Sequence, residues 1–282
     1  MKTVRIIPRL DIKGPNLVKG IHLEGLRVLG SPEVFAQYYY ENGADEIIFQ
    51  DVVASLFERN SLHEIISTTA KNIFIPITVG GGIRSIEDIH DVLRAGADKV
   101  SLNTAAVRNP SFIQAAANTF GSSTIVVAIE AIKGVDGNYY AFVDNGREET
   151  GLEVTQWAKK AAGLGAGEIL ITSVDFDGTG AGFDTELIET IKDKVNVPII
   201  AHGGGNKSEN LIKTIKKANP EALAFGSFLH YEAIHKIEKK TNEEERGNRN
   251  FLDNNQTFNK IQSGTIAELK QILFSNKIPC RV

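Results

Sequence analysis

The sequence carries one glycine motif twice. Residues 78–85 read TVGGGIRS and residues 201–208 read AHGGGNKS. Each time, Gly-Gly-Gly is followed by one variable residue, a basic residue and a serine. Two other pairs share the spacing: GADEIIFQDV with GAGEILITSVD, and RIIPRLDIK with IVVAIEAIK. Three motif pairs, each separated by about 120 residues, indicate an internal duplication. We therefore expect two related halves.

Each half contains four short β-rich runs that alternate with helical patterns such as SIEDIHDVLRAG. Eight strand–helix units in 282 residues predict an α/β fold, a single (β/α)8 TIM barrel over residues 1–282 with a four-plus-four duplication. A doubly wound parallel sheet is the alternative, and the duplication favours the barrel. The expected strands lie near 4–10, 46–51, 75–79, 98–102, 124–130, 168–173, 198–202 and 222–226.

Composition excludes several classes of protein. The net charge is −4 and no basic run with interleaved aromatic residues occurs, which argues against a nucleic-acid partner. No apolar stretch approaches the roughly 20 residues that span a bilayer, and Arg5 and Arg9 interrupt any signal-peptide pattern. The single thiol, Cys280, fits a reduced, cytoplasmic setting. No cluster has zinc-ligand spacing, so neither a metal ion nor a cofactor is predicted.

Glycines and small polar residues follow several expected strands. Function in a (β/α)8 barrel lies at the carboxyl ends of its strands, where glycines let backbone N–H groups approach an anion. The two halves therefore predict two phosphate cradles on opposite sides of one mouth; tight turns without a ligand are the alternative. The predicted cradle residues are Gly81, Gly82, Asn103 and Thr104 in the first half and Gly203, Gly204, Gly226 and Ser227 in the second.

Alternation along the strands predicts a charged lumen. Residues two apart share a face of a strand, and the face opposite the apolar one carries charges at the strand starts, namely Arg5, Glu46, Lys99 and Glu168. This ring is either a structural salt-bridge network or a gate for something that passes along the axis. At the other end, Asp11 and Glu130 are repeat-related carboxylates, expected to perform general acid–base chemistry rather than to cap turns.

Motifs along the chain resemble the cyclase subunit of imidazole glycerol phosphate synthase. They include PITVGGGIRS, GADKVSLNTAAV and GAGEILITSVDFDGTGAGFD, and the resemblance covers residues 1 to about 235 and the last helix. It implies that ammonia from a separate glutaminase subunit enters through a gate at Arg5, Glu46, Lys99 and Glu168, with Asp98 in the partner interface. It also implies a substrate with a phosphate at each end, and it assigns acid–base roles to Asp11 and Glu130. Further matched positions are the loop lysine Lys19 and the residues Asp177 and Gly178.

Four lumen positions depart from the family. Glu130 stands where the family has Asp, Arg9 where it has Cys, Gln50 where it has Leu, and His202 where it has Ser. Arg9 beside Asp11 is expected to lower the pKa of that carboxyl. His202 is expected either to titrate near neutral pH or to serve only as a hydrogen-bonding residue. We interpret Arg9, Gln50 and His202 as specificity residues for a changed acceptor.

The changed lumen favours a branch that makes acetamidino sugars for surface glycans such as lipopolysaccharide, with a third, sugar-activating protein. The cyclase of histidine biosynthesis is the alternative, supported by the two cradles. An inactive ammonia conduit or scaffold is the second alternative. Residues 236–262, KIEKKTNEEERGNRNFLDNNQTFNKIQ, form a polar insertion expected between the eighth strand and eighth helix. It is either neutral or a lid or dock for a larger substrate.

Overall fold

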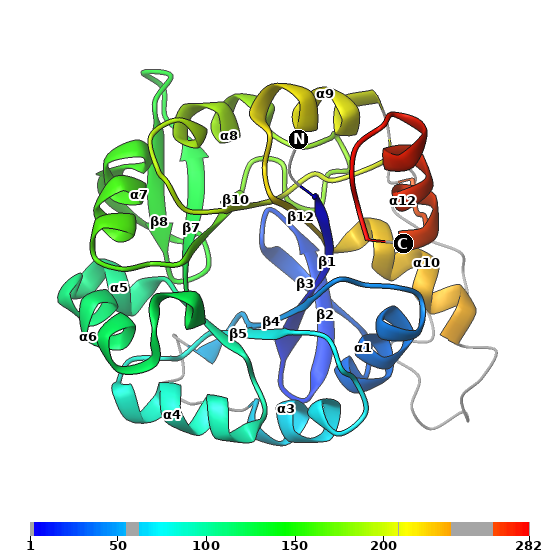
Figure 1. The fold of residues 1–282 in the computed structure, drawn as a ribbon, viewed down its shortest axis with the longest axis horizontal. Helices are drawn as coiled ribbons and strands as arrows, with labels where there is room; N and C mark the ends of the chain where they lie inside the picture. Colours follow the sequence, from blue (N-terminus) through cyan, green and yellow to red (C-terminus); the bar gives the residue numbers. More distant parts are fainter. Residues whose placement is uncertain (1–2, 55–61, 208, 238–261, 282) are drawn as a thin grey trace.

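The computed structural model describes residues 3–54, 62–207, 209–237 and 262–281. Eight parallel strands form a closed barrel in the order β10-β11-β12-β1-β4-β5-β6-β7, and β10 also pairs with β7 (Figure 1). This closure confirms the predicted (β/α)8 barrel and excludes the doubly wound sheet. The barrel strands are β1 (Arg5–Lys13), β4 (Ile47–Asp51), β5 (Ile77–Gly80), β6 (Lys99–Leu102), β7 (Ile125–Lys133), β10 (Glu168–Ser173), β11 (Ile199–His202) and β12 (Ala222–Phe225).

Helices surround the barrel as an outer ring (Figure 1). Local signals explain where several begin: Ser85 forms a capping box with Asp88, and the Asp184 carboxylate accepts from the Leu187 amide. The helices are α1 (Pro32–Glu41), α3 (His63–Ala70), α4 (Ile86–Ala95), α5 (Thr104–Arg108), α6 (Ser111–Phe120), α7 (Val154–Gly163), α8 (Thr185–Lys192), α9 (Glu209–Ala218), α10 (Ser227–Ile237) and α12 (Ile266–Ser275), with the 3-10 turn η1 (Ser122–Thr124) before β7.

Two apolar layers flank the strands. Side chains such as Ile6, Phe49 and Ile169 belong to the large core between barrel and helices. The alternate positions fill the lumen with a separate cluster, as the strand periodicity predicts. This lumen cluster consists of Ile7, Ile48, Val126, Ala128, Leu170, Ile200, Ala222 and Ala224.

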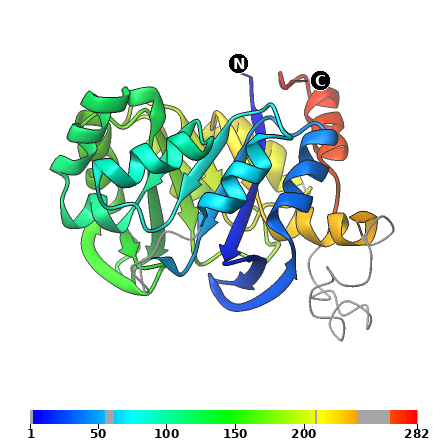
Figure 2. The ribbon, with the colours of Figure 1, turned by 90° about the horizontal axis from the view of Figure 1, so that it is seen from below.

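Two antiparallel hairpins extend the first strand of each half, and the sequence analysis did not predict them. β2 (Asn16–Ile21) and β3 (Glu24–Gly30) continue from β1, and β8 (Tyr139–Val143) and β9 (Glu148–Glu153) continue from β7. In Figure 2 the arrow of β1 leads to the β2–β3 hairpin on the side opposite the two chain termini. The hairpins therefore belong to the mouth at the carboxyl ends of the strands, and their equivalent positions agree with the duplication.

The last part of the chain differs from the expected layout. A helix, α10, follows β12 at once, so the eighth strand is followed by two described helices, α10 and α12. The predicted insertion at 236–262 lies outside the described residues except for its ends. Within the described ranges, no helix has both the length and the apolar character needed to cross a membrane.

Candidate active site

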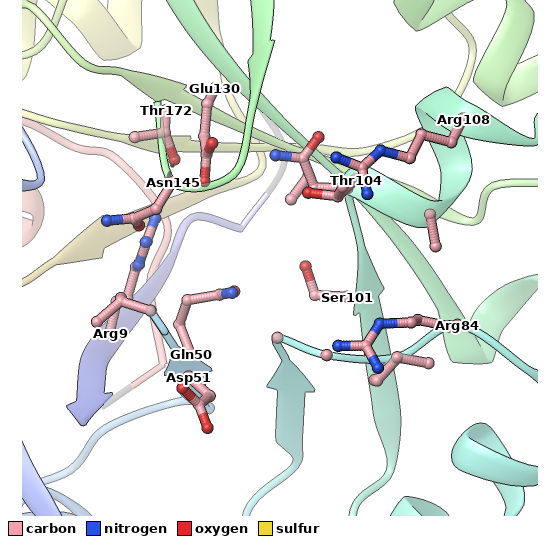
Figure 3. A pocket seen from close by; sticks show the side chains of 17 residues that line it. Arg9, Gln50, Asp51, Arg84, Ser101, Thr104, Arg108, Glu130, Asn145 and Thr172 are labelled. Carbon is pink, nitrogen blue, oxygen red and sulfur yellow. Dashed lines mark hydrogen bonds between the residues drawn. The ribbon is translucent and has the colours of Figure 1, made fainter. Parts of the chain in front are cut away.

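The larger pocket at the mouth has a volume of about 260 Å³ and contains the first predicted cradle (Figure 3). Gly81 and Gly82 have φ of 99° and 73°, and a Cβ at Gly81 would collide with the Asp51 carbonyl. Within the described part of the chain, the buried Ser101 Oγ and Asn103 Oδ1 have no hydrogen-bond partner. Both are therefore available to a ligand. The lining also includes Arg9, Gln50, Arg84, Thr104, Arg108, Glu130, Asn145 and Thr172.

The second cradle surrounds a pocket of only about 10 Å³. Gly203 and Gly204 have φ of 101° and 77°, which glycine adopts readily. The side-chain oxygen of Ser227 is buried and, among the described residues, without a partner. The structure thus brings together every residue predicted for this cradle, but leaves little open space beside them. The predicted residues in its lining are Asp177, Gly178, Gly203, Gly204, Gly226 and Ser227, with His202 next to them.

A buried charged cluster lies between the two cradles. Arg9 Nε donates to Asp11 Oδ1 at 2.9 Å, and Lys19 Nζ lies 2.8 Å from Asp177 Oδ2 and 3.3 Å from Asp11 Oδ2. Arg9 Nη1 also lies 3.0 Å from Thr172 Oγ1 and 3.1 Å from His202 Nδ1. Arg9 and Lys19 are each only 2% exposed. Lys19 therefore occupies the mouth rather than solvent, beside the second cradle.

The cluster sets the charges of its members. Burial opposes ionisation of Asp11, but the charges of Arg9 and Lys19 outweigh it and hold the pKa of Asp11 below its ordinary value. This result agrees with the expected effect of Arg9. For His202, burial and then the charges of Arg9 and Lys19 lower the pKa well below its usual range. Of the two alternatives for His202, this lowered pKa favours a hydrogen-bonding residue with a neutral imidazole over a group that titrates near neutral pH.

Glu130 occupies a different environment from Asp11. Burial raises the pKa of Glu130 to about 7, although Arg9 and a 2.8 Å hydrogen bond from the Gly146 amide favour its ionised form. Glu130 lines the larger pocket, whereas Asp11 lines neither pocket. A carboxyl that titrates near pH 7 can both give and accept a proton at working pH. The two repeat-related carboxylates thus differ chemically: Glu130 can exchange protons with a ligand, and Asp11 is a fixed anion.

The ring predicted at the strand starts is present and closed. Arg5 lies 2.6 Å from both Glu46 and Glu168, while Lys99 lies 3.2 Å from Glu46 and 2.8 Å from Glu168. The nearby carboxylates raise the pKa of Arg5 despite the opposing effect of burial. The pKa of Glu168 is lowered, because the charges and hydrogen bonds of Arg5 and Lys99 outweigh burial. Each cation therefore bridges both anions, below the apolar lumen cluster.

Asp98 lies beside this ring, and its side chain is exposed. Its carboxylate accepts from the Ile77 amide at 2.8 Å. Asp45 and Glu221 accept in the same way from the amides of Ile6 and Ile199. Asp98 thus belongs to a repeated hydrogen-bond pattern, in which an acidic side chain at the start of one strand accepts from the backbone amide of a neighbouring strand. Its predicted contact with a partner stays a prediction.

Four polar residues around the mouth were not predicted from the sequence. Arg84 and Arg108 add cations to the first cradle, and Asn145 lies in the turn after β8. His230 is fully buried; its Nε2 lies 2.9 Å from the Arg9 carbonyl, and its Nδ1 lies 2.6 Å from the Tyr39 hydroxyl. Arg84 is the basic residue of the repeated motif, so that signal was present. The other three depend on contacts between distant segments.

Comparison with known proteins decides the family. The model of a family described as "Histidine biosynthesis protein" matches residues 5–235. The chain belongs to this family. A protein of Legionella pneumophila is 56% identical over 209 residues, covering 74% of this chain and 99% of the relative. One of Exiguobacterium sp. is 48% identical, covering 80% and 88%, and one of Lactococcus lactis subsp. cremoris is 41% identical, covering 100% and 98%.

All three relatives are named "Imidazole glycerol phosphate synthase subunit HisF". The chain is an enzyme of this type within the histidine biosynthesis family, a lyase or cyclase subunit. None of these three names refers to a surface glycan. The comparisons therefore support the histidine alternative of the sequence analysis over the acetamidino-sugar branch that it preferred.

Proposed function

We propose that the chain is the cyclase subunit of imidazole glycerol phosphate synthase in histidine biosynthesis. The observation that carries the proposal is Glu130, a carboxyl with a pKa of about 7 in the pocket of the first cradle, with a second glycine cradle at the same mouth. Two cradles suit a substrate with a phosphate at each end. Glycine-rich turns supply backbone N–H groups and helix N-termini supply partial positive charge to such anions.

The proposed reaction begins with ammonia, which passes the charged ring and the apolar lumen cluster and attacks the ketone carbon of the ribulose part. The C–N bond replaces the carbonyl bond to oxygen, and that oxygen leaves as water. Glu130 then exchanges protons as the imidazole ring closes and the substrate is cleaved to imidazole glycerol phosphate and aminoimidazole carboxamide ribotide. Asp11, held ionised by Arg9 and Lys19, stabilises positive charge that develops during the reaction. Lys19 and Asp177, which lie beside the second cradle, rearrange when the second phosphate binds there. Gln50 and His202 shape the lumen beside the substrate.

The proposed partner is a glutaminase subunit that docks at the strand starts and releases ammonia beside the ring of Arg5, Glu46, Lys99 and Glu168. The single cysteine, Cys280, lies near the chain end and not in the mouth, so it is not placed for glutamine hydrolysis. We further propose a reducing, cytoplasmic setting, which that free thiol fits.

Turnover with ammonium chloride and the bisphosphorylated ribulose precursor tests the proposal. We expect the purified chain to form imidazole glycerol phosphate without any partner, since ammonia then enters from solution. A folded chain that binds inorganic phosphate but forms no product would contradict the proposal. The Glu130→Gln variant is the control and should be inactive.

One observation favours a second candidate, in which the same machinery delivers ammonia to an acetamido sugar. Arg9 lies between the cradles and pairs with Asp11, so its side chain fills space that a substrate reaching both cradles would have to cross. A sugar activated by a third protein is then the acceptor. Conversion of an activated acetamido sugar in the same assay, without conversion of the ribulose precursor, would favour this candidate. Failure with both acceptors, together with stimulation of the glutaminase, would favour a scaffold.

A further inference from the structure

A three-residue turn after β8 touches two parts of the mouth that are otherwise separate. The turn is formed by Asp144, Asn145 and Gly146, whose φ values are 52°, 61° and 76°. Asp and Asn tolerate this left-handed region better than other side-chain-bearing residues, and Gly adopts it freely. Because all three residues have positive φ, their amide and side-chain groups do not alternate between two faces as they would in a regular strand.

The first residue fixes the turn to the wall of the larger pocket. The Asp144 amide donates to Thr104 Oγ1 at 3.2 Å, and Arg108 Nη2 donates to Asp144 Oδ2 at 2.9 Å. Thr104 and Arg108 both belong to the helix α5 that follows β6. The turn is therefore held on the first half of the barrel, although it comes from the second half.

The other two residues face the acid–base group and the opposite hairpin. The Gly146 amide donates to Glu130 Oε2 at 2.8 Å, and Asn145 Nδ2 donates to the Leu23 carbonyl at 3.1 Å. Leu23 is the tip of the β2–β3 hairpin, here named the strap. The tip is only 2% exposed, and His22 beside it donates its amide to the Asp177 carbonyl at 2.9 Å. The tip of the strap thus packs against the Asp177 segment, which lines the second cradle.

We propose that Asn145 is a positioning residue that couples closure of the strap to the placement of Glu130. Its side chain holds the strap tip, and its main chain continues directly into the amide that holds the Glu130 carboxylate. When the strap moves away, the Leu23 carbonyl leaves Asn145, and the turn stays anchored at Asp144 but loses its contact on the side of Gly146. Glu130 is then correctly held only when the strap covers the site. This inference deepens the proposed function and rests on it for its catalytic consequence, but the coupling itself is measurable without substrate.

The coupling is tested by following backbone amides of the full chain by NMR between pH 5.5 and 8.5. We expect the amides of Gly146 and Leu23 to share one titration midpoint near 7, the pKa of Glu130. Other charged groups face these amides: Arg9, Asp11 and Asp144 around Glu130, and His22, Lys19 and Asp177 around the strap tip. In Glu130→Gln the shared midpoint should disappear from both amides, which assigns it to Glu130 and not to these neighbours.

The Asn145→Gly variant removes the side chain and keeps a residue suited to the φ of 61°. We expect Gly146 to keep a midpoint but at a higher pH, because a less well oriented Gly146 amide favours the ionised form of Glu130 less. Leu23 should lose its midpoint. Asn138→Ala, which changes an exposed asparagine in the neighbouring β7–β8 turn, is the matched control and should leave both midpoints in place. Retention of the Leu23 midpoint in Asn145→Gly overturns the proposal. The proposal is also overturned if the Leu23 amide of the unsubstituted chain shows no midpoint near 7. That second result does not depend on whether the variant folds.

The catalytic consequence is read in the ammonium-dependent assay. Asn145→Gly should lower kcat about tenfold, with KM changed less than about twofold, because Glu130 acts after binding. Its pH–rate profile should also shift on the acidic side, which a purely structural loss would not produce. A normal profile with an unchanged kcat would contradict the positioning role, whereas an inactive unsubstituted chain would instead contradict the proposed function.

Discussion

The residue that matters most for the chemistry is Glu130, because its environment rather than its type gives it a useful proton affinity. A carboxyl ordinarily ionises near pH 4.5, and burial at the mouth raises the pKa of Glu130 to about 7. Asp11, at the repeat-related position, is held ionised by Arg9 and Lys19. One duplicated position has thus produced a proton-exchanging carboxyl and a fixed anion, with neighbouring cations as the cause of the difference.

Glu130→Gln is expected to abolish turnover while leaving the fold intact. It should also change how stability depends on pH. Between pH 4.5 and 7 the folded chain binds more protons at Glu130 than the unfolded chain does, so this carboxyl lowers the free energy of unfolding as the pH rises through that window. Gln does not ionise. The variant should therefore gain up to about 3 kcal/mol relative to the unsubstituted chain between pH 5 and pH 8.

Chemical denaturation at the two pH values measures this gain. The control is Glu189→Gln, which makes the same substitution at an exposed position on α8, away from the mouth. The alternative result is that the two chains differ in free energy of unfolding by the same amount at pH 5 and at pH 8. That result would show that Glu130 ionises at its ordinary pH. Undiminished turnover by Glu130→Gln would remove it from the catalytic mechanism.

At the scale of elements, four strands meet in the charged ring: β1, β4, β6 and β10 each contribute its first residue or the residue before it. A buried ion-pair network is weak evidence for stability, since desolvation of the charges offsets much of their attraction. The ring closes one end of a lumen whose next layer is apolar. This arrangement fits a barrier that a small neutral molecule such as ammonia passes more easily than ions.

Lys99→Ala should separate a gate from a structural ring. We expect turnover with glutamine and the glutaminase partner to change about tenfold, equivalent to about 1.4 kcal/mol, with a much smaller change when ammonium salt is supplied. Ammonia from solution can reach the mouth directly. Lys270→Ala removes a comparable ion pair, with Asp45 at 2.9 Å, and is the control; it should alter neither activity. Equal losses in both assays for Lys99→Ala would indicate a structural role.

At the scale of the whole molecule, the two ends of the barrel divide the work. The mouth carries the two pockets and both hairpins, and the opposite end carries the ring and Asp98. The proposed glutaminase must therefore dock at the end with the strand starts. In the proposed function, ammonia released there would pass the charged ring and the lumen cluster to reach the mouth.

Asp98→Lys is expected to weaken binding of the glutaminase about tenfold, since it reverses a charge at the proposed interface. Ammonium-dependent turnover should stay the same because the mouth is distant. Asp98→Asn is the matched variant: its amide oxygen can still accept from Ile77, so it removes the charge and keeps the link between strands. Titration calorimetry with the purified partner measures both. Equal binding by Asp98→Lys and the unsubstituted chain would place the interface elsewhere.

The sequence by itself determined the barrel, the charged ring and which residues make up most of the site. Repeats, alternation of apolar residues and glycine-rich turns are encoded locally, and a closed eightfold barrel then forces every strand end to one face. The tertiary structure alone decided the chemical state of those residues. The neutral His202, the pKa of Glu130, the burial of Lys19 and the contact between Asn145 and the strap depend on side chains from different strands and hairpins. Burial and the distances between charges fix these properties, and neither is encoded within one stretch of chain.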